Sequence, residues 1–125
     1  MRFVMTTAVM IAALGLGGCV TQQGLYKWGG YDNMLYAGYK DPTQMEAMRV
    51  KLESHIGEME KGGQKVAPGL YAELGTLYLQ SGDATKATTL YARERDTWPE
   101  SKGLMDSLIQ SIGRRQQQAK AETTK

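Results

Sequence analysis

The chain has 125 residues, the length of one small domain, which excludes a two-domain enzyme. Charged residues make up 22% and hydrophobic residues 42% of it, so the composition is that of a globular protein, neither disordered nor collagen-like. The formal net charge of +2 falls to +1 if Arg2 is removed with a targeting segment, which leaves no basic surface typical of nucleic-acid binding.

Residues 1–18 are predicted to be a cleaved signal peptide. Arg2 gives this segment a short positive start, and residues 3–16 are apolar and carry no charge. An apolar stretch of this length is too short to span a bilayer. We therefore expect a targeting segment and not a membrane helix.

A short motif surrounds the only cysteine of the chain and consists of Leu16, Gly17, Gly18 and Cys19. It resembles the lipobox of bacterial lipoproteins. The resemblance implies cleavage after Gly18, diacylglycerol on the Cys19 thiol, a fatty acid such as palmitate on the new amine, and no other cofactor. The alternative is an unpaired thiol that happens to follow an apolar run. Val20 stands where an Asp commonly marks inner-membrane retention in enteric lipoproteins, so we expect an outer-membrane protein that faces the periplasm.

Residues 19–30 are expected to form the lipidated N-terminus and a linker, which ends in an aromatic motif. Tyr26, Trp28 and Tyr31 are spaced as Tyr-x-Trp-Gly-x-Tyr. One interpretation is that these rings cap the core of a helical body, with two glycines turning the chain into a helix over 31–40. The other interpretation is a patch that binds a partner protein, because Tyr and Trp are enriched at interfaces.

The next predicted helix begins at Asp41 and Pro42 and runs to about residue 61. Asp is a favoured N-cap, and Pro loses nothing at the first helical position. His55 is the only histidine, so no metal site is expected and we interpret it as a surface or boundary residue. Apolar residues three or four positions apart predict one buried face, made of Met45, Met48, Leu52, Ile56 and Met59.

Residues 68–101 resemble one tetratricopeptide repeat. The repeat has two aromatic positions around a Leu-Gly pair, then a small residue followed four positions later by an aromatic residue, then a proline. The resemblance implies two antiparallel helices that approach closely where the small residues lie. The matching positions are Tyr71, Leu74, Gly75, Tyr78, Ala87, Tyr91 and Pro99.

Local signals support the same two helices. Gly82 fits the C-terminal cap of the first helix, and Asp83 fits the N-cap of the second. Glu94 departs from the repeat, because it stands where the family usually has a small Ala. This departure leaves open how closely the second helix meets the element that follows.

The predicted fold is therefore all-α, with tetratricopeptide-like helical hairpins over 31–113. A lone repeat cannot bury its faces, so the helices before residue 61 must supply its neighbour. An amphipathic stretch after Pro99 is expected to form a C-terminal capping helix that ends near Gly113. Residues 114–125 are polar and unpatterned, so we expect a disordered tail.

Taken together, the lipobox, the aromatic motif, the Asp41–Pro42 helix start and the single repeat resemble a small family of uncharacterised proteobacterial lipoproteins. That family is usually encoded beside a curli-secretion-channel-like lipoprotein. The resemblance implies a shared outer-membrane assembly. We therefore expect the membrane and other envelope proteins as partners, and neither nucleic acid nor a small-molecule substrate.

These features favour a lipid-tethered protein–protein interaction scaffold, with Tyr71 and Tyr78 as mixed core and groove residues. The alternative is a lipoprotein regulator or pilotin-like factor for an envelope machine. Enzymatic activity is not expected, because general acid–base chemistry needs titratable groups that converge in a pocket. The carboxylates are predicted to lie on solvated faces without such convergence, namely those of Glu53, Glu58, Glu60 and Glu73.

Overall fold

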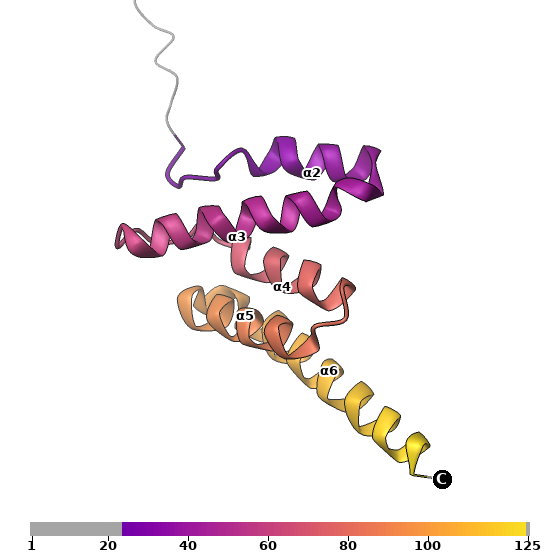
Figure 1. Ribbon diagram of the computed structural model, residues 1–125. Helices are drawn as coiled ribbons and strands as arrows, with labels where there is room; N and C mark the ends of the chain where they lie inside the picture. Colours follow the sequence, from indigo (N-terminus) through magenta and orange to yellow (C-terminus); the bar gives the residue numbers. More distant parts are fainter. Residues whose placement is uncertain (1–23, 125) are drawn as a thin grey trace, which may run out of the picture.

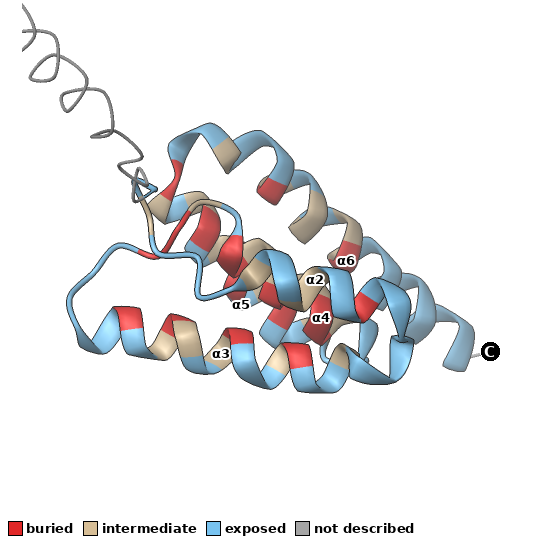
Figure 2. Ribbon diagram, turned by 90° about the horizontal axis from the view of Figure 1, so that it is seen from above, coloured by how far each residue is buried: buried red, intermediate tan, exposed pale blue. Residues whose placement is uncertain are grey.

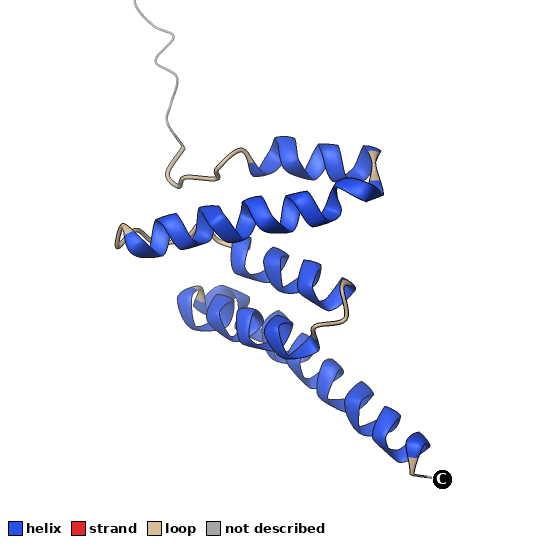
Figure 3. Cartoon of the chain, viewed as in Figure 1, coloured by secondary structure: helices blue, strands red, loops and turns tan. Residues whose placement is uncertain are grey.

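A computed structural model describes residues 24–124. The predicted signal peptide and the lipobox residues Leu16, Gly17, Gly18 and Cys19 lie outside the described part. Every regular element within residues 24–124 is a helix, which confirms the all-α fold class (Figure 3). The elements are α2 (Tyr31–Lys40), the 3₁₀ turn η1 (Pro42–Gln44), α3 (Met45–Lys61), α4 (Leu70–Gln80), α5 (Ala84–Thr97), the 3₁₀ turn η2 (Pro99–Ser101) and α6 (Lys102–Thr123).

The helices stack in chain order, and each runs back along the one before it (Figure 1). α2 and α3 form the first antiparallel pair, α4 and α5 form the tetratricopeptide-like hairpin, and α6 follows α5. α3 packs against α4, so the helices before residue 61 do supply the neighbour that a single repeat requires. One core runs through the stack, from Met48 on α3 to Ile112 on α6.

The α4–α5 hairpin depends on a close approach at Gly75. A Cβ at this position would lie 3.0 Å from Cε1 of Tyr91 and 3.2 Å from the carbonyl oxygen of Ala87. Tyr91 and Ala87 are themselves almost completely buried. The small residues of the repeat are therefore needed where the sequence predicted, because any larger side chain would push the two helices apart.

The turn between α4 and α5 follows the predicted capping pattern. Gly82 has a positive φ of 91°, and the next amide, on Asp83, donates to the carbonyl of Tyr78 at 2.9 Å. The Asp83 carboxylate accepts from the amide of Lys86 at 2.9 Å and so caps α5. The hairpin register is fixed by local chemistry at its tip.

The α3 helix begins and ends close to the predicted positions. The Asp41 carboxylate accepts from the amide of Thr43 at 3.0 Å, but the first turn is the 3₁₀ turn η1 and the α-helix proper begins at Met45. The predicted apolar face is the buried one. Met48, Leu52, Ile56 and Met59 are buried, and Met45 is half-buried.

The end of α6 differs from the prediction. The helix does not stop near Gly113, and residues 114–123 are helical instead of disordered. They are also exposed, as Figure 2 shows for the far half of α6. The apolar pattern that ends at Ile112 marks the end of packing, whereas Arg, Gln, Ala and Lys beyond it are good helix formers and continue the helix into solvent.

Glu94, which stands where the repeat usually has a small Ala, connects the starts of two helices. Its side chain is buried, and Oε1 accepts from the amide of Gly69 at 2.7 Å and from Oγ of Ser101 at 3.3 Å. Gly69 precedes α4, and Ser101 precedes α6. The carboxylate therefore connects the start of the hairpin to the start of the capping helix, and α6 packs along α5 despite the larger side chain.

Candidate functional site

A groove lies between α2 and α4, with the start of α3 as its floor. It encloses about 310 Å³. The side chains from α2 and α3 are mainly apolar, and α4 contributes polar ones. The lining residues are Leu35, Gly38, Tyr39, Met45, Met48, Glu73, Thr76 and Gln80.

Gly38 sets how closely α2 approaches α3 beside this groove. A Cβ at this position would lie 2.9 Å from the sulfur of Met45 and 3.4 Å from that of Met48. Two flexible methionines therefore lie directly against the backbone of α2. Such side chains adapt their shape to a partner more readily than branched ones.

Glu73 gives the groove a negative group. Burial and the neighbouring Glu73 carboxylate raise the pKa of Tyr31 to about 12. A second hollow of about 290 Å³ shares Met45 and Gln80 with the groove, so the depression continues toward the C-terminal end of α4. The whole is an open channel lined by apolar and polar side chains. Glu73 is the carboxylate of the first part, and Glu46, which pairs with Arg49, is that of the second.

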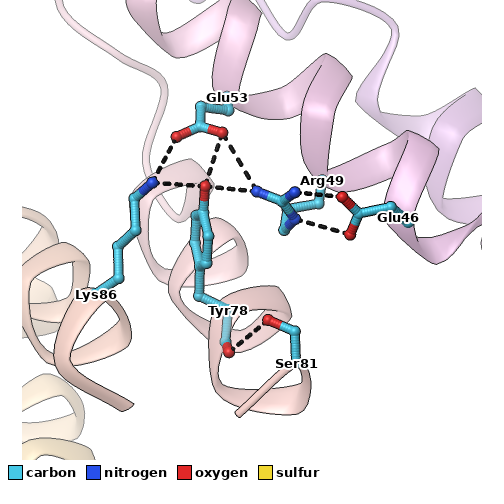
Figure 4. Close-up of polar contacts among 6 residues, drawn as sticks. All are labelled: Glu46, Arg49, Glu53, Tyr78, Ser81 and Lys86. Carbon is cyan, nitrogen blue, oxygen red and sulfur yellow. Dashed lines mark hydrogen bonds and ion pairs between the residues drawn. The ribbon is translucent and has the colours of Figure 1, made fainter. Parts of the chain in front are cut away.

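A polar network lies where α3, α4 and α5 meet (Figure 4). The hydroxyl of Tyr78 donates to Glu53 at 2.7 Å and accepts from Arg49 at 2.6 Å and from Lys86 at 2.7 Å. Lys86 also pairs with Glu53 at 3.0 Å, and Arg49 pairs with Glu46. One tyrosine oxygen thus connects side chains of three helices.

A second, smaller network lies two helical turns away. Tyr71 on α4 donates to Glu60 on α3 at 2.8 Å, and Arg93 on α5 donates to the same carboxylate oxygen at 2.6 Å. Each network therefore combines a tyrosine, a glutamate and a cation from the same three helices.

The two networks repeat with a spacing of seven residues on every helix. The tyrosines are seven positions apart on α4, as are the glutamates on α3 and the cations on α5. Seven residues are close to two turns of an α-helix, so both sets face the same way. The side chains of Glu53 and Glu60 are 43% and 40% exposed, as predicted for solvated faces, but the prediction that no groups converge on them is wrong. The heptad spacing was visible in the sequence, but which helices would be neighbours was not.

The charge states in these networks favour holding helices together over moving protons. The hydrogen bond from Tyr78, together with Lys86 and Arg49, lowers the pKa of Glu53. Hydrogen bonds to Tyr78 and Glu53 raise the pKa of Lys86, and burial with the bond to Glu60 raises that of Tyr71 to about 12. All three groups keep their usual charge at neutral pH, whereas a general acid or base works best with a pKa near the operating pH.

The structure divides the predicted partner-binding residues into two groups. Tyr71 and Tyr78 are buried core residues whose hydroxyls reach the networks, and neither lines the groove. Tyr26 and Tyr31 are half-buried against the core, and Trp28 is exposed. The aromatic motif thus partly caps the core, as one of the two interpretations held, and leaves one ring in solvent.

Within residues 24–124 no three His, Cys, Asp or Glu side chains gather as they would around a metal ion. His55 is half-buried, with Nε2 3.0 Å from the carbonyl oxygen of Lys27, consistent with a boundary residue. None of the described helices is long and apolar enough to cross a membrane.

Comparison with known proteins gives a family and no function. No curated protein and no solved structure matches the chain. The model of a domain of unknown function, DUF4810, matches residues 25–108. The match begins at the aromatic motif and runs through the hairpin into α6, which is more than half of the chain. The chain therefore belongs to the DUF4810 family.

Proposed function

We propose that the protein is a lipid-anchored envelope lipoprotein whose helical body docks a partner protein in the groove between α2 and α4. The groove is the observation that carries the proposal, because it is the place where apolar and polar groups line one open channel. Stacked helical repeats commonly bind peptides or helices in such channels. The scaffold has no need of a catalytic residue.

The groove favours a partner segment with apolar side chains and a positive charge. Met45, Met48 and Leu35 offer a deformable apolar floor, and Glu73 is the carboxylate at the wall. A Lys or Arg on the partner would pair with Glu73, while its apolar neighbours bury against the methionines. This chemistry suits an amphipathic helix with one basic position.

The anchor is proposed from the lipobox at Cys19. The resemblance to small proteobacterial lipoproteins suggests outer-membrane attachment facing the periplasm, with another envelope lipoprotein, such as a curli-secretion-channel-like one, as the partner. Two or three lipid chains would tether the body firmly without any membrane-spanning helix. The tether would hold the groove within reach of membrane-bound partners.

The groove is tested by affinity purification from native membranes in mild detergent, followed by mass spectrometry. Glu73→Lys reverses the groove charge and is expected to reduce recovery of co-purified envelope proteins about tenfold or more, the effect of losing roughly 1.4 kcal/mol. The matched control is Glu122→Lys on the exposed end of α6, which has the same charge change outside the groove. Equal recovery from both variants would refute the groove as docking site.

The anchor is tested separately with Cys19→Ala. This change is expected to abolish labelling by a palmitate analogue and to release the body from the membrane. Continued labelling with normal membrane occupancy would refute the lipid anchor. Stable, stoichiometric recovery of partners from the native protein indicates a structural subunit, whereas recovery only after crosslinking indicates the regulator or pilotin-like alternative.

A further inference from the structure

The segment that leads into α2 is held firmly and still exposes apolar side chains. Tyr26 packs edge-on against Trp98, with ring centres 5.3 Å apart. Leu25, the residue before Tyr26, and Trp28, two residues after it, remain 88% and 41% exposed. Apolar exposure on an anchored backbone is a feature that folding alone does not require.

His55 on α3 holds the same segment from the other side. Its Nε2 lies 3.0 Å from the carbonyl oxygen of Lys27, and its ring occupies the space that a Cβ of Gly29 would need, at 2.5 Å. Gly29 itself has a positive φ of 60°. The backbone between Tyr26 and Gly29 is therefore fixed on the body, and it presents Trp28 outward in a defined position.

The charges around this segment are mixed, with an excess of lysine. Lys27 is exposed, and Lys65 lies over the ring of Trp98, 3.6 Å from its centre. Lys51 lines the hollow beside His55. Two carboxylates face the same region, those of Asp32 beside Trp28 and of Glu58 beside His55.

We propose that Leu25 and Trp28 insert into the headgroup region of the membrane that holds the lipid on Cys19, and thereby fix the orientation of the helical body. The inference rests on the proposed lipid anchor. Leu25 is six positions after Cys19, and a fully extended chain of that length spans at most about 20 Å. The membrane surface is thus within reach of this segment whatever path the chain takes.

The chemistry of the segment fits a lipid surface better than a protein. Trp and Tyr concentrate at the headgroup level of membranes, and Lys side chains extend from there toward the phosphates. Leu25 and Trp28 alone offer far less than the roughly 800 Å² that each side of a stable protein interface buries. A tethered segment needs only a weak affinity, because the tether keeps its local concentration high.

The test uses a chain that begins at Cys19 and so retains every contact described for residues 24–124. Cys19 is coupled to a maleimide-bearing phospholipid in vesicles of phosphatidylethanolamine and phosphatidylglycerol, with brominated phosphatidylcholine as the quencher. The tryptophan fluorescence of the native sequence is compared with that of Trp28→Phe, which retains only Trp98. Subtracting the spectrum of Trp28→Phe from that of the native sequence gives the emission of Trp28 alone.

We expect brominated lipid to quench the Trp28 contribution and its emission to shift to shorter wavelength on tethering. The untethered protein is expected to bind the same vesicles at least about tenfold more weakly after Leu25→Ser with Trp28→Ser, because burial of one large apolar side chain contributes a factor of that size. The control is Leu104→Ser, which removes a leucine that is 63% exposed on α6 and should leave binding unchanged.

A Trp28 emission that is unquenched and identical in tethered and free protein would overturn the proposal. The Trp28 emission could instead shift to shorter wavelength with vesicles made from native outer membranes but not with protein-free vesicles. That result would assign the segment to a protein partner and would also overturn the proposal. Chemical coupling makes the test independent of lipidation in the cell. Failure of the Cys19→Ala experiment and failure of this one are therefore distinguishable.

Discussion

The hairpin α4–α5 and the pair α2–α3 have the same antiparallel topology but are held together by different means. In the hairpin, Gly75 lets the helices approach until a ring and a backbone carbonyl fill the space between them. In the first pair, the one buried residue of α2 is Gly38, and its neighbours are flexible methionine sulfurs. The hairpin is a rigid support, and α2 is a more adaptable wall.

This difference suits a protein that binds through a groove. The wall of the groove that can move is α2, while α4 is fixed on its other face by the core and by the two tyrosine networks. Local opening of a protein starts where few apolar contacts are buried. We therefore expect partner binding to displace α2 and to leave α4 in place.

The largest expected effect comes from truncating the core of the hairpin. Leu74→Ala removes a buried side chain of α4 and should lower the free energy of unfolding by about 2–5 kcal/mol. Leu35→Ala removes a half-buried side chain of α2 and should cost only about 1 kcal/mol. Urea denaturation measures both. Similar losses in the two variants would contradict the proposed difference between the helix pairs.

A pair of glycine substitutions probes the close approach itself. Gly75→Ala is expected to cost about 1–3 kcal/mol, because its Cβ would be too close to both Tyr91 and the Ala87 carbonyl. Gly57→Ala places the same methyl group on α3 with no atom within 4 Å, so it should stabilise the protein by about 0.5–1 kcal/mol. Thermal unfolding of the two variants should shift in opposite directions. A gain in stability from Gly75→Ala would mean that the helices are farther apart than described.

Removing the Tyr71 hydroxyl should lower the free energy of unfolding by a smaller amount, and this loss should depend on pH. Tyr71→Phe removes the hydrogen bond to Glu60 and should cost about 1 kcal/mol at neutral pH. The pKa of Tyr71 is raised from 10.0 to about 12 in the folded protein, so the stability that it contributes is complete below pH 10 and is lost as the pH rises toward 12.

The free energy of unfolding measured across that interval should therefore fall less steeply in Tyr71→Phe than in the native protein. Tyr36→Phe is the control, because Tyr36 is exposed on α2. If both variants retain the native slope, Tyr71 is not bonded as the structure describes.

The smallest effect on stability is expected from the far half of α6. Deletion of residues 114–125 removes exposed residues and should change the free energy of unfolding by less than about 0.5 kcal/mol. The helical signal in far-ultraviolet circular dichroism should nevertheless decrease. An unchanged signal per molecule would restore the original expectation of a disordered tail.

Much of the fold was accessible from the sequence because the decisive signals are local. Gly82 with Asp83, and Asp41 with Pro42, report the helix ends through chemistry within a few residues. The α6 extension was missed because a helix that leaves the core loses its apolar periodicity but not its helix propensity. Apolar periodicity in the sequence cannot detect a helical segment that is exposed to solvent on all sides.

The candidate site was less predictable because it depends on which helices become neighbours. Glu73 on α4 lies beside Tyr31 of α2 and lines the groove together with Leu35 of α2. No spacing within either helix predicts these contacts. The convergence of other groups on Glu53 and Glu60 was not predicted for the same reason, because these partners lie on α4 and α5. Contacts between helices far apart in sequence are decided by the packing of the whole stack.

Because the two networks repeat every seven residues, they specify the alignment of α3 with α4 only weakly. If α3 slid two turns, by about 10 Å, Tyr71 would meet Glu53 in place of Glu60 and would find the same kind of partner. The polar groups therefore cannot by themselves distinguish the native alignment from a displaced one. The alignment of α4 with α5 is fixed separately, by the cap at Gly82 and Asp83 and by the fit of Gly75 against Tyr91. The native alignment of α3 with α4 therefore depends on the packing of buried apolar side chains of α3 such as Leu52 and Ile56.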